Sequence, residues 1–335
     1  MAYIKKISLK DIAAVAGVSP ALVSFVLNGK GKEYRVNEDT AKRILDIARE
    51  LNYQPNLAAR SLRSGRTKTI GLVVSDISNP FFSQLARLLE DEATKRGYTV
   101  LFASSDEDVN KMSRVVSSLV NRGVDGLIIV PCEGAEKYMV SLINNNIPIV
   151  LFDRYFPELN ISYVALNNAS AAYMATKHLL AAGYTSPCIV AYDIDLIHMK
   201  ERVRGYKQAM EEVEKKRYIN IVYLKRNALK KSAERILPKV IDGGVDSFLF
   251  GTNMISLACL YVLREMPNIS LNRIGLVGFD GNPVFDFLDI PISYVQQPVA
   301  MLMQKALEIL LDNISNGNSV QSVLADGEFR SNYLR

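Results

Sequence analysis

The sequence is poor in the residues that build disulfide frameworks and metal centres. Its 335 residues include only three cysteines and two histidines. Cys132, Cys188 and Cys259 are scattered, odd in number and each set in an apolar run, which indicates buried thiols in a reducing compartment. His178 lies in an apolar helical stretch, and neither it nor His198 indicates a metal site or a catalytic triad. We therefore expect no disulfide bond and no bound metal ion.

Long apolar runs and enzyme motifs are missing as well. No run approaches the roughly 20 apolar residues that span a membrane. The beginning of the chain, MAYIKKISLKD, has lysines but no apolar core and no small-residue cleavage site, so we expect no secretory signal and a cytoplasmic protein without a membrane partner. The patterns GxGxxG after a strand, GxxxxGK[ST], GxSxG, HExxH and CxxC do not occur. We therefore expect a protein that is not an enzyme and that binds no cofactor.

Positive charge is concentrated in the first fifth of the chain. The net charge is +5, but residues 1–68 hold 13 lysines and arginines against 6 acids, a net charge of +7. The remaining residues hold 27 and 29, a net charge of −2. A basic segment joined to a mildly acidic body is typical of a DNA-binding domain attached to a domain that does not bind DNA. A solvated basic face is the alternative interpretation.

The basic segment carries the boundary signals of two short helices. Ser8 and Asp11 have the spacing of a capping box, and Gly17 supplies a left-handed stop for the first helix. Ser19 can cap a second helix whose first turn holds Pro20, the helical position where proline costs little. Two helices joined by a tight turn predict a helix-turn-helix, which places its second helix in the major groove of DNA. A plain helical hairpin is the alternative.

A third helix and a connector follow. Asn37 can cap the third helix, and the apolar stripe of that helix would complete a small all-α domain over residues 1–54. Residues 55–69 are predicted to form a hinge and linker, in which Asn56 can cap a helix from Leu57 to about Leu62. Isolated helices shorter than roughly 12–15 residues are marginal in water, so we expect this helix to fold only when two copies pack on DNA.

From Ile70 onward, short apolar runs alternate with amphipathic helical stretches, one of them predicted over 200–216. Continuous apolar strands separated by helices indicate buried parallel sheets, and because the pattern restarts after Asn167 we predict a two-lobed α/β body of doubly wound sheets over residues 70–335. Lobe one is expected over about 70–162 and 294–318, and lobe two over about 163–293 and 319–335. Such sheets hold ligands at the carboxyl ends of their strands, so the expected site is a cleft between the lobes.

Seven motifs stand in a fixed order along nearly the whole chain: LKDIAAVAGVSPALVSFVLNG, YQPNLAARSLRSGRTKTIGLVV, SNPFF, FDR, RVRGY, GLVGFD and VQQP. In this order they resemble the LacI/GalR (lactose-repressor/galactose-repressor) family of bacterial transcription regulators. The resemblance implies a repressor that acts as a homodimer on an operator, a double-stranded DNA site with two-fold symmetry. It also implies a body similar to the type I periplasmic binding proteins, with a small-molecule effector between the lobes.

The same resemblance implies which residues of the basic segment meet DNA. The recognition helix would be the one from Ser19 to Asn28, and its base contacts would come from Pro20, Ala21 and Phe25. All three side chains are apolar, so base readout should depend on van der Waals contact, for instance with thymine methyl groups. Packing in the core is the alternative for Phe25. The contacts that position the helix on the DNA backbone would come from Ser8, Ser19, Ser24, Asn28 and Lys30.

The hinge helix is implied to meet the minor groove. Leu62 matches the apolar wedge that the family inserts between base steps to bend the duplex. Arg60 and Arg63 flank it for phosphate contact, Asn56 begins the helix, and Ala59 is small enough for close approach of a second copy. An ordinary linker residue is the alternative for Leu62.

Nine residues of the body are implied by the resemblance to bind the effector. They combine amides and carboxylates that pair with hydroxyls, forked guanidinium donors, and aromatic faces that can pack on a sugar ring. They are Asn79, Phe81, Phe82, Asp153, Arg154, Arg202, Asn253, Asp280 and Gln297. Asp76 and Tyr155 are possible further lining residues. The alternatives are a helix cap for Asn79, a structural ion pair for Asp153 and Arg154, and a turn former for Asp280.

This set of side chains favours a carbohydrate effector, either a mono- or disaccharide or its phosphate. A nucleobase effector and a partner protein in place of a small molecule are alternatives within the same fold. A nucleotide-dependent enzyme and an exported solute-binding protein are alternatives from other classes. The sequence lacks the motifs of a nucleotide-dependent enzyme. An exported solute-binding protein would have an export signal and would lack the basic N-terminal segment.

The wedge hypothesis for Leu62 predicts the behaviour of one variant. In Leu62→Ala, both operator affinity and DNA bending should fall, because the truncated side chain no longer separates the base steps. Effector binding should stay at the wild-type level. A bending assay on a palindromic duplex, run beside calorimetry of the effector, checks both points. Bending equal to that of the wild-type protein would rule the wedge out.

Overall fold

The computed structural model describes residues 7–54, 65–213, 219–267, 269–281, 285, 290–317 and 319–331. The chain divides into two compact units, Met1–Thr67 and Lys68–Arg335, and the division falls inside the linker predicted over residues 55–69. Within the described part, no single helix is long and apolar enough to cross a membrane. The bent pair Leu9–Ala16 and Pro20–Leu27 passes that test only jointly, by length and composition.

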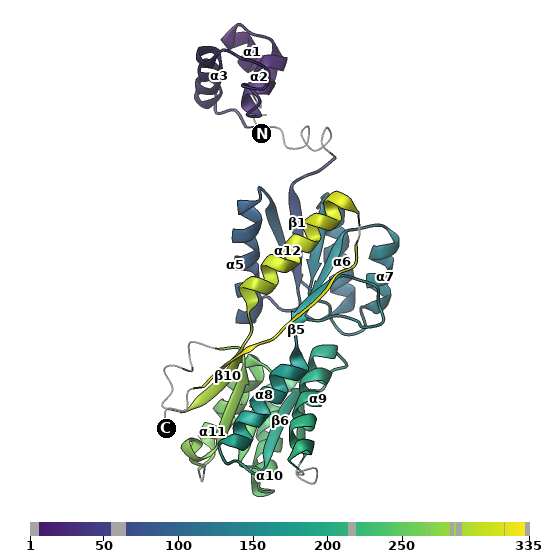
Figure 1. Ribbon diagram of the computed structural model, residues 1–335, viewed down its shortest axis with the longest axis vertical. Helices are drawn as coiled ribbons and strands as arrows, with labels where there is room; N and C mark the ends of the chain where they lie inside the picture. The colour runs from purple at the N-terminus through teal and green to yellow at the C-terminus, as the bar shows by residue number, and fades with distance from the viewer. Residues whose placement is uncertain are drawn as a thin grey trace. The chain divides into compact units, whose positions relative to one another are not determined.

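The first unit, the head, holds the three predicted helices, α1 (Leu9–Ala16), α2 (Pro20–Leu27) and α3 (Glu38–Glu50) (Figure 1). Ser8 and Asp11 form the predicted capping box, with the Ser8 amide donating to Asp11 Oδ2 at 2.7 Å. Gly17 ends α1 with a φ of 63°. The α1 and α2 axes meet at 107°, within the range of about 90–120° typical of a helix-turn-helix.

A small apolar core holds the head together. Ile12 of α1, Val23 of α2 and Ile44 of α3 are fully buried at its centre. The Arg43 guanidinium of α3 donates to the Ala16 carbonyl at 2.9 Å, which pairs one of the free carbonyls at the end of α1. This bond and the shared core fix the orientation of α1 relative to α3.

The second unit, the body, begins with a six-stranded sheet in the order β11-β5-β4-β3-β1-β2, in which all strands run parallel. Its strands are β1 (Thr69–Val74), β2 (Thr99–Ser104), β3 (Gly126–Ile129), β4 (Ile149–Phe152), β5 (Tyr163–Leu166) and β11 (Ser322–Ala325). Two apolar clusters cover its faces. One cluster includes α5 (Pro80–Lys95) and α12 (Val299–Asn316), and the other includes α6 (Val109–Asn121) and α7 (Glu136–Asn144).

A second six-stranded sheet has the order β12-β10-β9-β8-β6-β7, with only β12 antiparallel to its neighbour. Its strands are β6 (Pro187–Tyr192), β7 (Asn220–Leu224), β8 (Ser247–Phe250), β9 (Gly275–Phe279), β10 (Ile292–Gln296) and β12 (Glu328–Arg330). Four helices pack on it: α8 (Asn168–Ala181), α9 (Ile197–Glu212), α10 (Leu229–Asp242) and α11 (Asn253–Glu265). Two single turns, η2 (Arg226–Ala228) and η3 (Leu271–Arg273), join these elements. The predicted pair of doubly wound lobes is confirmed (Figure 1).

The lobe boundaries predicted at residues 163, 294 and 319 are wrong. Strand β5 pairs with β4 in the first sheet, so lobe one continues past 162 to Leu166. Strand β10 pairs with β9, so the return to lobe one comes after Gln296 and not at 294. Strand β11 pairs with β5 in lobe one, so the final passage to lobe two comes after Ala325 and not at 319. Strand pairing decides these boundaries, because a strand belongs to the sheet with which it is hydrogen-bonded.

The chain therefore crosses between the lobes three times, at Asn167, at Gln297–Pro298 and at Asp326–Gly327. Two of the crossings are bonded to each other. The Asn167 side-chain amide donates to Asp326 Oδ1 at 3.0 Å, and its backbone amide donates to the Ala325 carbonyl at 2.8 Å. These bonds join the first and third crossings into one connection between the lobes.

Helices α8 and α9 of lobe two approach each other closely at Gly205. A Cβ atom at this position would lie 2.0 Å from the Ala169 carbonyl oxygen, which is backbone and cannot turn aside. Gly205 therefore allows α9 to rest directly on α8.

Gly205→Ala should destabilise lobe two by about 3 kcal/mol, because the added methyl group forces the two helices apart. Urea denaturation followed by circular dichroism measures the change. Lys207→Ala, on the exposed face of the same helix, is the matched control and should change the free energy of unfolding by less than about 0.5 kcal/mol. Equal stability of the two variants would contradict the close contact.

Candidate functional site

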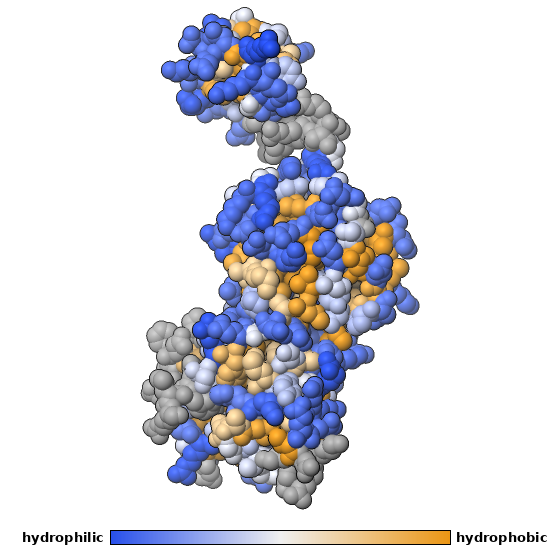
Figure 2. All heavy atoms as spheres, viewed as in Figure 1, coloured by the Kyte–Doolittle hydropathy of each residue, from blue (hydrophilic) through white to orange (hydrophobic). Residues whose placement is uncertain are grey.

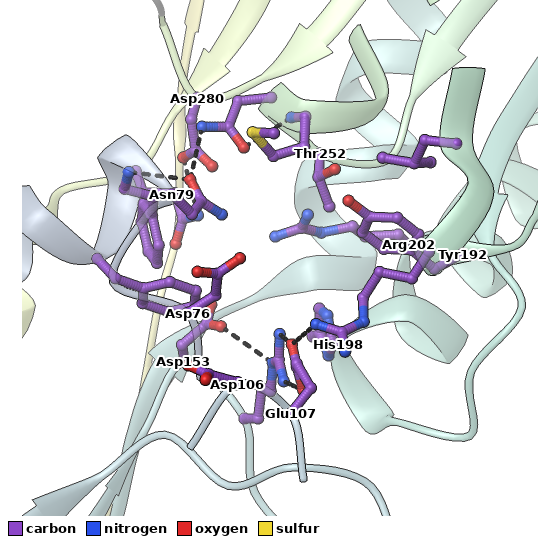
Figure 3. A pocket seen from close by; sticks show the side chains of 18 of the residues that line it. Asp76, Asn79, Asp106, Glu107, Asp153, Tyr192, His198, Arg202, Thr252 and Asp280 are labelled. Carbon is purple, nitrogen blue, oxygen red and sulfur yellow. Dashed lines mark hydrogen bonds and ion pairs between the residues drawn. The ribbon is translucent and has the colours of Figure 1, made fainter. Parts of the chain in front are cut away.

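A cavity of about 350 Å³ lies between the two lobes of the body, at the carboxyl ends of the parallel strands (Figure 3). Its wall includes all nine residues implied to bind an effector: Asn79, Phe81, Phe82, Asp153, Arg154, Arg202, Asn253, Asp280 and Gln297. Asp76 lines it too, whereas Tyr155 is not among its lining residues and instead stacks on Tyr163 at 3.9 Å between ring centres. The structure thus brings these side chains together, and their contact with a ligand stays a prediction.

Two aspartates occupy equivalent places in the two lobes. Asp153 follows β4 and Asp280 follows β9, each the third strand in the order of its sheet and each ending in phenylalanine. Their φ angles are 65° and 64°, in the left-handed region that aspartate tolerates better than most residues. Asp280 is therefore the turn former considered above, and its side chain still lines the cavity.

Burial is the main influence on the pKa of both carboxyl groups. It raises the pKa of Asp280 to about 6, although nearby Arg202 and a hydrogen bond that Gln297 Nε2 donates at 2.9 Å favour the charged form. Burial also raises the pKa of Asp153, against the attraction of Arg154 and Arg202. The cavity therefore holds two carboxyl groups that are poorly solvated when ionised.

Arg154 is buried and held mainly by a residue that the sequence did not single out. Its two terminal nitrogens each lie 2.8 Å from an oxygen of Glu107, which follows β2, and one of them also donates to the Pro131 carbonyl at 3.3 Å. Its Nε lies 3.6 Å from Asp153 Oδ2, which is too long for a hydrogen bond. The structural ion pair considered for Asp153 and Arg154 is thus secondary to the one with Glu107.

Arg202 reaches into the cavity from α9 (Figure 3). Its Nε donates to Asn168 Oδ1 at 2.8 Å, one terminal nitrogen donates to the Gly251 carbonyl, and the guanidinium lies 3.9 Å from the centre of the Phe279 ring. These contacts fix the group in place and leave its second terminal nitrogen without a hydrogen-bond partner in the described part of the chain.

Among the described residues, three polar contacts join the lobes across the cavity or beside it. Asn253 Nδ2 donates to Asn79 Oδ1 at 3.1 Å, and this oxygen also accepts from the Phe81 amide as the cap of α5. The Asp195 amide donates to a Glu133 carboxylate oxygen at 2.9 Å. Arg226 of lobe two lies 3.4 Å from Glu107 of lobe one. Asn79 therefore is a helix cap, as considered above, and also touches the opposite lobe.

Sequence reasoning missed several lining residues, among them Glu107, Tyr192, His198, Arg226 and Thr252. His198 was missed because it lies before the helix predicted over 200–216, whereas the observed helix begins at Ile197 and includes it. Its Nδ1 is buried without a partner among the described residues, and burial, followed by the charges of Arg154 and Arg202, lowers its pKa well below the usual value. His198 is therefore a neutral side chain in the cavity wall, whereas His178 packs against the Phe329 ring as a structural residue.

The predicted DNA-reading residues of the head lie along and beside α2. Pro20 and Ala21 are exposed in its first turn, and the face of the head in view is largely hydrophilic (Figure 2). The other polar residues of this set have partners within the head. Ser8 and Ser19 cap α1 and α2, Asn28 Nδ2 donates to Ser24 Oγ at 3.2 Å, and Lys30 lies 3.7 Å from Glu33.

Phe25 is half-buried and stacks on exposed Tyr34, with 3.7 Å between ring centres and an angle of 3° between the rings. This stack gives Phe25 a fixed orientation beside the helix, and Tyr34 is a neighbour that sequence reasoning did not find. The hinge residues Asn56, Ala59, Arg60, Leu62 and Arg63 lie outside the described residues.

Comparison with known proteins agrees with this arrangement. Residues 8–56 match the model for bacterial regulatory proteins of the lacI family, and residues 70–285 match the model for the periplasmic binding protein domain. A ribose operon repressor from Halalkalibacterium halodurans is 32% identical over 309 residues, which cover 92% of this chain and 90% of that protein. The chain belongs to the LacI family.

Two further proteins are similar to this chain over nearly its whole length. The transcriptional repressor PurR of Aliivibrio salmonicida is 29% identical over 313 residues, which cover 92% of each chain. The lac repressor dimer bound to operator and the anti-inducer ONPF superposes with a TM-score of 0.85 at 20% identity, covering 98% of each chain, and shows the common fold. The LacI-family protein is therefore a DNA-binding transcription regulator controlled by an effector, and its predicted fold class is confirmed.

The raised pKa of Asp280 predicts a pH dependence of stability. A carboxyl group whose pKa is raised in the folded state stabilises that state fully at pH values below its pKa in the unfolded chain, which is near 3.8. This contribution is lost as the pH rises through about 6, the pKa in the folded state. Relative to Asp280→Asn, the wild-type protein should lose about 2 kcal/mol of unfolding free energy between pH 4 and pH 7. Urea denaturation across this range measures it.

The exposed Asp242 of the same lobe provides the control for this measurement. Asp242→Asn should keep the pH profile of the wild-type protein. If Asp280→Asn and the wild-type protein change in parallel with pH, Asp280 is not the group responsible.

Proposed function

We propose that this LacI-family protein is a cytoplasmic repressor that binds a palindromic operator as a homodimer and senses a small carbohydrate. The observation that carries the proposal is the cavity between the lobes, where carboxylates, amides, a fixed guanidinium and two aromatic rings converge. The homodimer follows from the head, because one recognition helix covers one half-site of an operator. We propose no catalytic role for the cavity, since the neutral His198 lies among arginines with no nucleophile paired to it in the described region.

The chemistry of the wall fits a ligand rich in hydroxyl groups. Asp153 and Asp280 can accept from hydroxyls, and the free terminal nitrogen of Arg202 can donate to one. Phe81 and Phe82 meet edge to face, with 5.2 Å between ring centres, and offer an apolar surface to the carbon skeleton of a sugar. The volume of about 350 Å³ is near the lower end of the roughly 300–1,000 Å³ typical of small-molecule sites, which favours a small sugar.

A change in the angle between the lobes can transmit the effect of ligand binding to the head. A sugar that contacts Asp153 of lobe one and Asp280 of lobe two bridges the same gap as the bond between Asn79 and Asn253. Its binding energy therefore depends on the angle between the lobes, and a ligand shifts a conformational equilibrium only by such a difference in affinity. We propose that this angle sets the spacing of the two hinge segments in a dimer, and so the affinity for the operator.

Binding assays with defined sugars test the proposal. Thermal-shift assays and calorimetry with ribose, fructose, glucose and cellobiose should identify a ligand, with hypoxanthine as the nucleobase comparison. Asp153→Asn should weaken that ligand at least about tenfold, since a hydrogen bond to a charged group contributes about 1.5–3 kcal/mol. Asp91→Asn, a change of the same charge on the exposed face of α5, should leave binding as it is.

The coupling to DNA needs a second measurement. Duplexes selected from a random library should include a palindrome that binds with a strong dependence on salt, and the same sugar should change that affinity at constant salt. Tight binding of hypoxanthine alone would place the protein with the nucleobase sensors. Binding of no small molecule, together with palindrome binding, would support a partner protein as the signal.

A further inference from the structure

Acidic side chains outnumber basic ones in the wall of the cavity. Three guanidinium groups face five carboxylates, and His198 is neutral. The guanidinium groups are those of Arg154, Arg202 and Arg226, and the carboxylates are those of Asp76, Asp106, Glu107, Asp153 and Asp280. With every acid ionised, the wall has a net charge of −2. An anionic ligand therefore enters an unfavourable field unless some of the cations are free to meet it.

Glu107 occupies two of the three cations. It binds Arg154 through both carboxylate oxygens at 2.8 Å, and one of these oxygens also lies 3.4 Å from Arg226 (Figure 3). The side chains of Glu107 and Arg154 are only 11% and 8% exposed, so water screens their attraction weakly. Burial disfavours the charged form of Glu107, but the two arginines outweigh it and lower the pKa of the carboxyl group. Glu107 therefore stays ionised at neutral pH.

At two helix ends beside the cavity, those of α5 and α11, backbone amides are already hydrogen-bonded. Amide groups at a helix N-terminus are the usual backbone site for phosphate. At the start of α5, Pro80 has no amide hydrogen, and the Phe81 amide donates to Asn79 Oδ1 at 3.1 Å. At the start of α11, the Met254 amide donates to Asn253 Oδ1 at 2.8 Å and the Ile255 amide donates to Thr252 Oγ1 at 3.1 Å. These three amides are therefore not available to an anion.

From these contacts we infer that Glu107 makes the cavity selective for a neutral sugar over a phosphorylated one. The inference rests on the proposed function and narrows the range of sugars left open there. Paired guanidinium donors bind phosphate strongly, and the fork of Arg154 that would supply them is already filled by a carboxylate. Specificity of this kind comes from a group that repels the wrong ligand as well as from groups that attract the right one.

Inorganic phosphate tests the inference without knowledge of the effector. In Glu107→Gln the fork of Arg154 is no longer neutralised, so millimolar phosphate should raise the melting temperature by at least about 2 °C, and added sodium chloride should reduce this rise. The wild-type protein should show no rise. Glu107→Asp keeps the charge and should also show none, which separates the effect of charge from that of shape.

Asp106→Asn is the matched control. It makes the same change of charge one residue away, but the Asp106 carboxylate hydrogen-bonds to Lys111 and Ser104 and has only a weaker, longer-range attraction to Arg226. Phosphate should leave its melting temperature unchanged. A phosphate response as large in Asp106→Asn as in Glu107→Gln would overturn the inference, because the response would then follow net charge alone.

Pairs of sugars provide a readout that needs no variant. The wild-type protein should bind ribose or fructose at least tenfold more tightly than ribose 5-phosphate or fructose 1-phosphate, and Glu107→Gln should reverse or remove that preference. If the wild-type protein prefers the phosphorylated sugar, the inference fails while the proposed function stands. If it binds no sugar of either kind, the proposed function fails with it. These wild-type measurements decide the matter even if Glu107→Gln does not fold.

Discussion

Charge buried between the two lobes has to be paired, and this requirement governs what the cavity can bind. Removing one partner of a buried ion pair leaves an uncompensated charge and typically costs about 3–5 kcal/mol. Arg154 meets the requirement through both oxygens of Glu107, and Arg202 meets it through an amide, a carbonyl and an aromatic face. The carboxylates of Asp153 and Asp280 are less completely paired, and they are the groups that remain for hydroxyl donors.

The fold places these charges by simple means. Strands β4 and β9 are buried at every position, so polar side chains can appear only where the strands end. Because parallel strands end at the same edge of a sheet, both lobes present their polar residues to one space. The left-handed φ angles of Asp153 and Asp280 then turn the chain at equivalent points in the two lobes.

Local signals in the sequence were enough to predict most of the helices and strands. The caps at Ser8, Ser19 and Asn37 marked the head helices, and apolar runs marked nearly all the strands, because both depend on neighbours in the sequence. The nine cavity residues came from the family resemblance and do lie together. The lobe crossings could not be predicted in this way, because β5, β10 and β11 are assigned by strands distant in the chain.

The same limit explains the missed residues of the cavity. Glu107 lies in the acidic stretch SSDED, where no local pattern distinguishes the acid that meets Arg154 from those that face water. Asp106, the residue before it, bonds to the half-buried Lys111 and is itself mostly exposed. His198 required the true start of α9, and Arg226 required the position of lobe two against lobe one. Each depends on contacts between residues that lie far apart in the sequence.

The hydrogen bond from Arg202 to Asn168 has a mechanical consequence. Asn168 is the first residue of α8 and directly follows Asn167, the first passage between the lobes, which is itself bonded to the third passage through Asp326. The cavity wall and the pivot thus share a rigid linkage of two hydrogen bonds and one peptide unit. A ligand that displaces the guanidinium therefore displaces the segments that join the lobes.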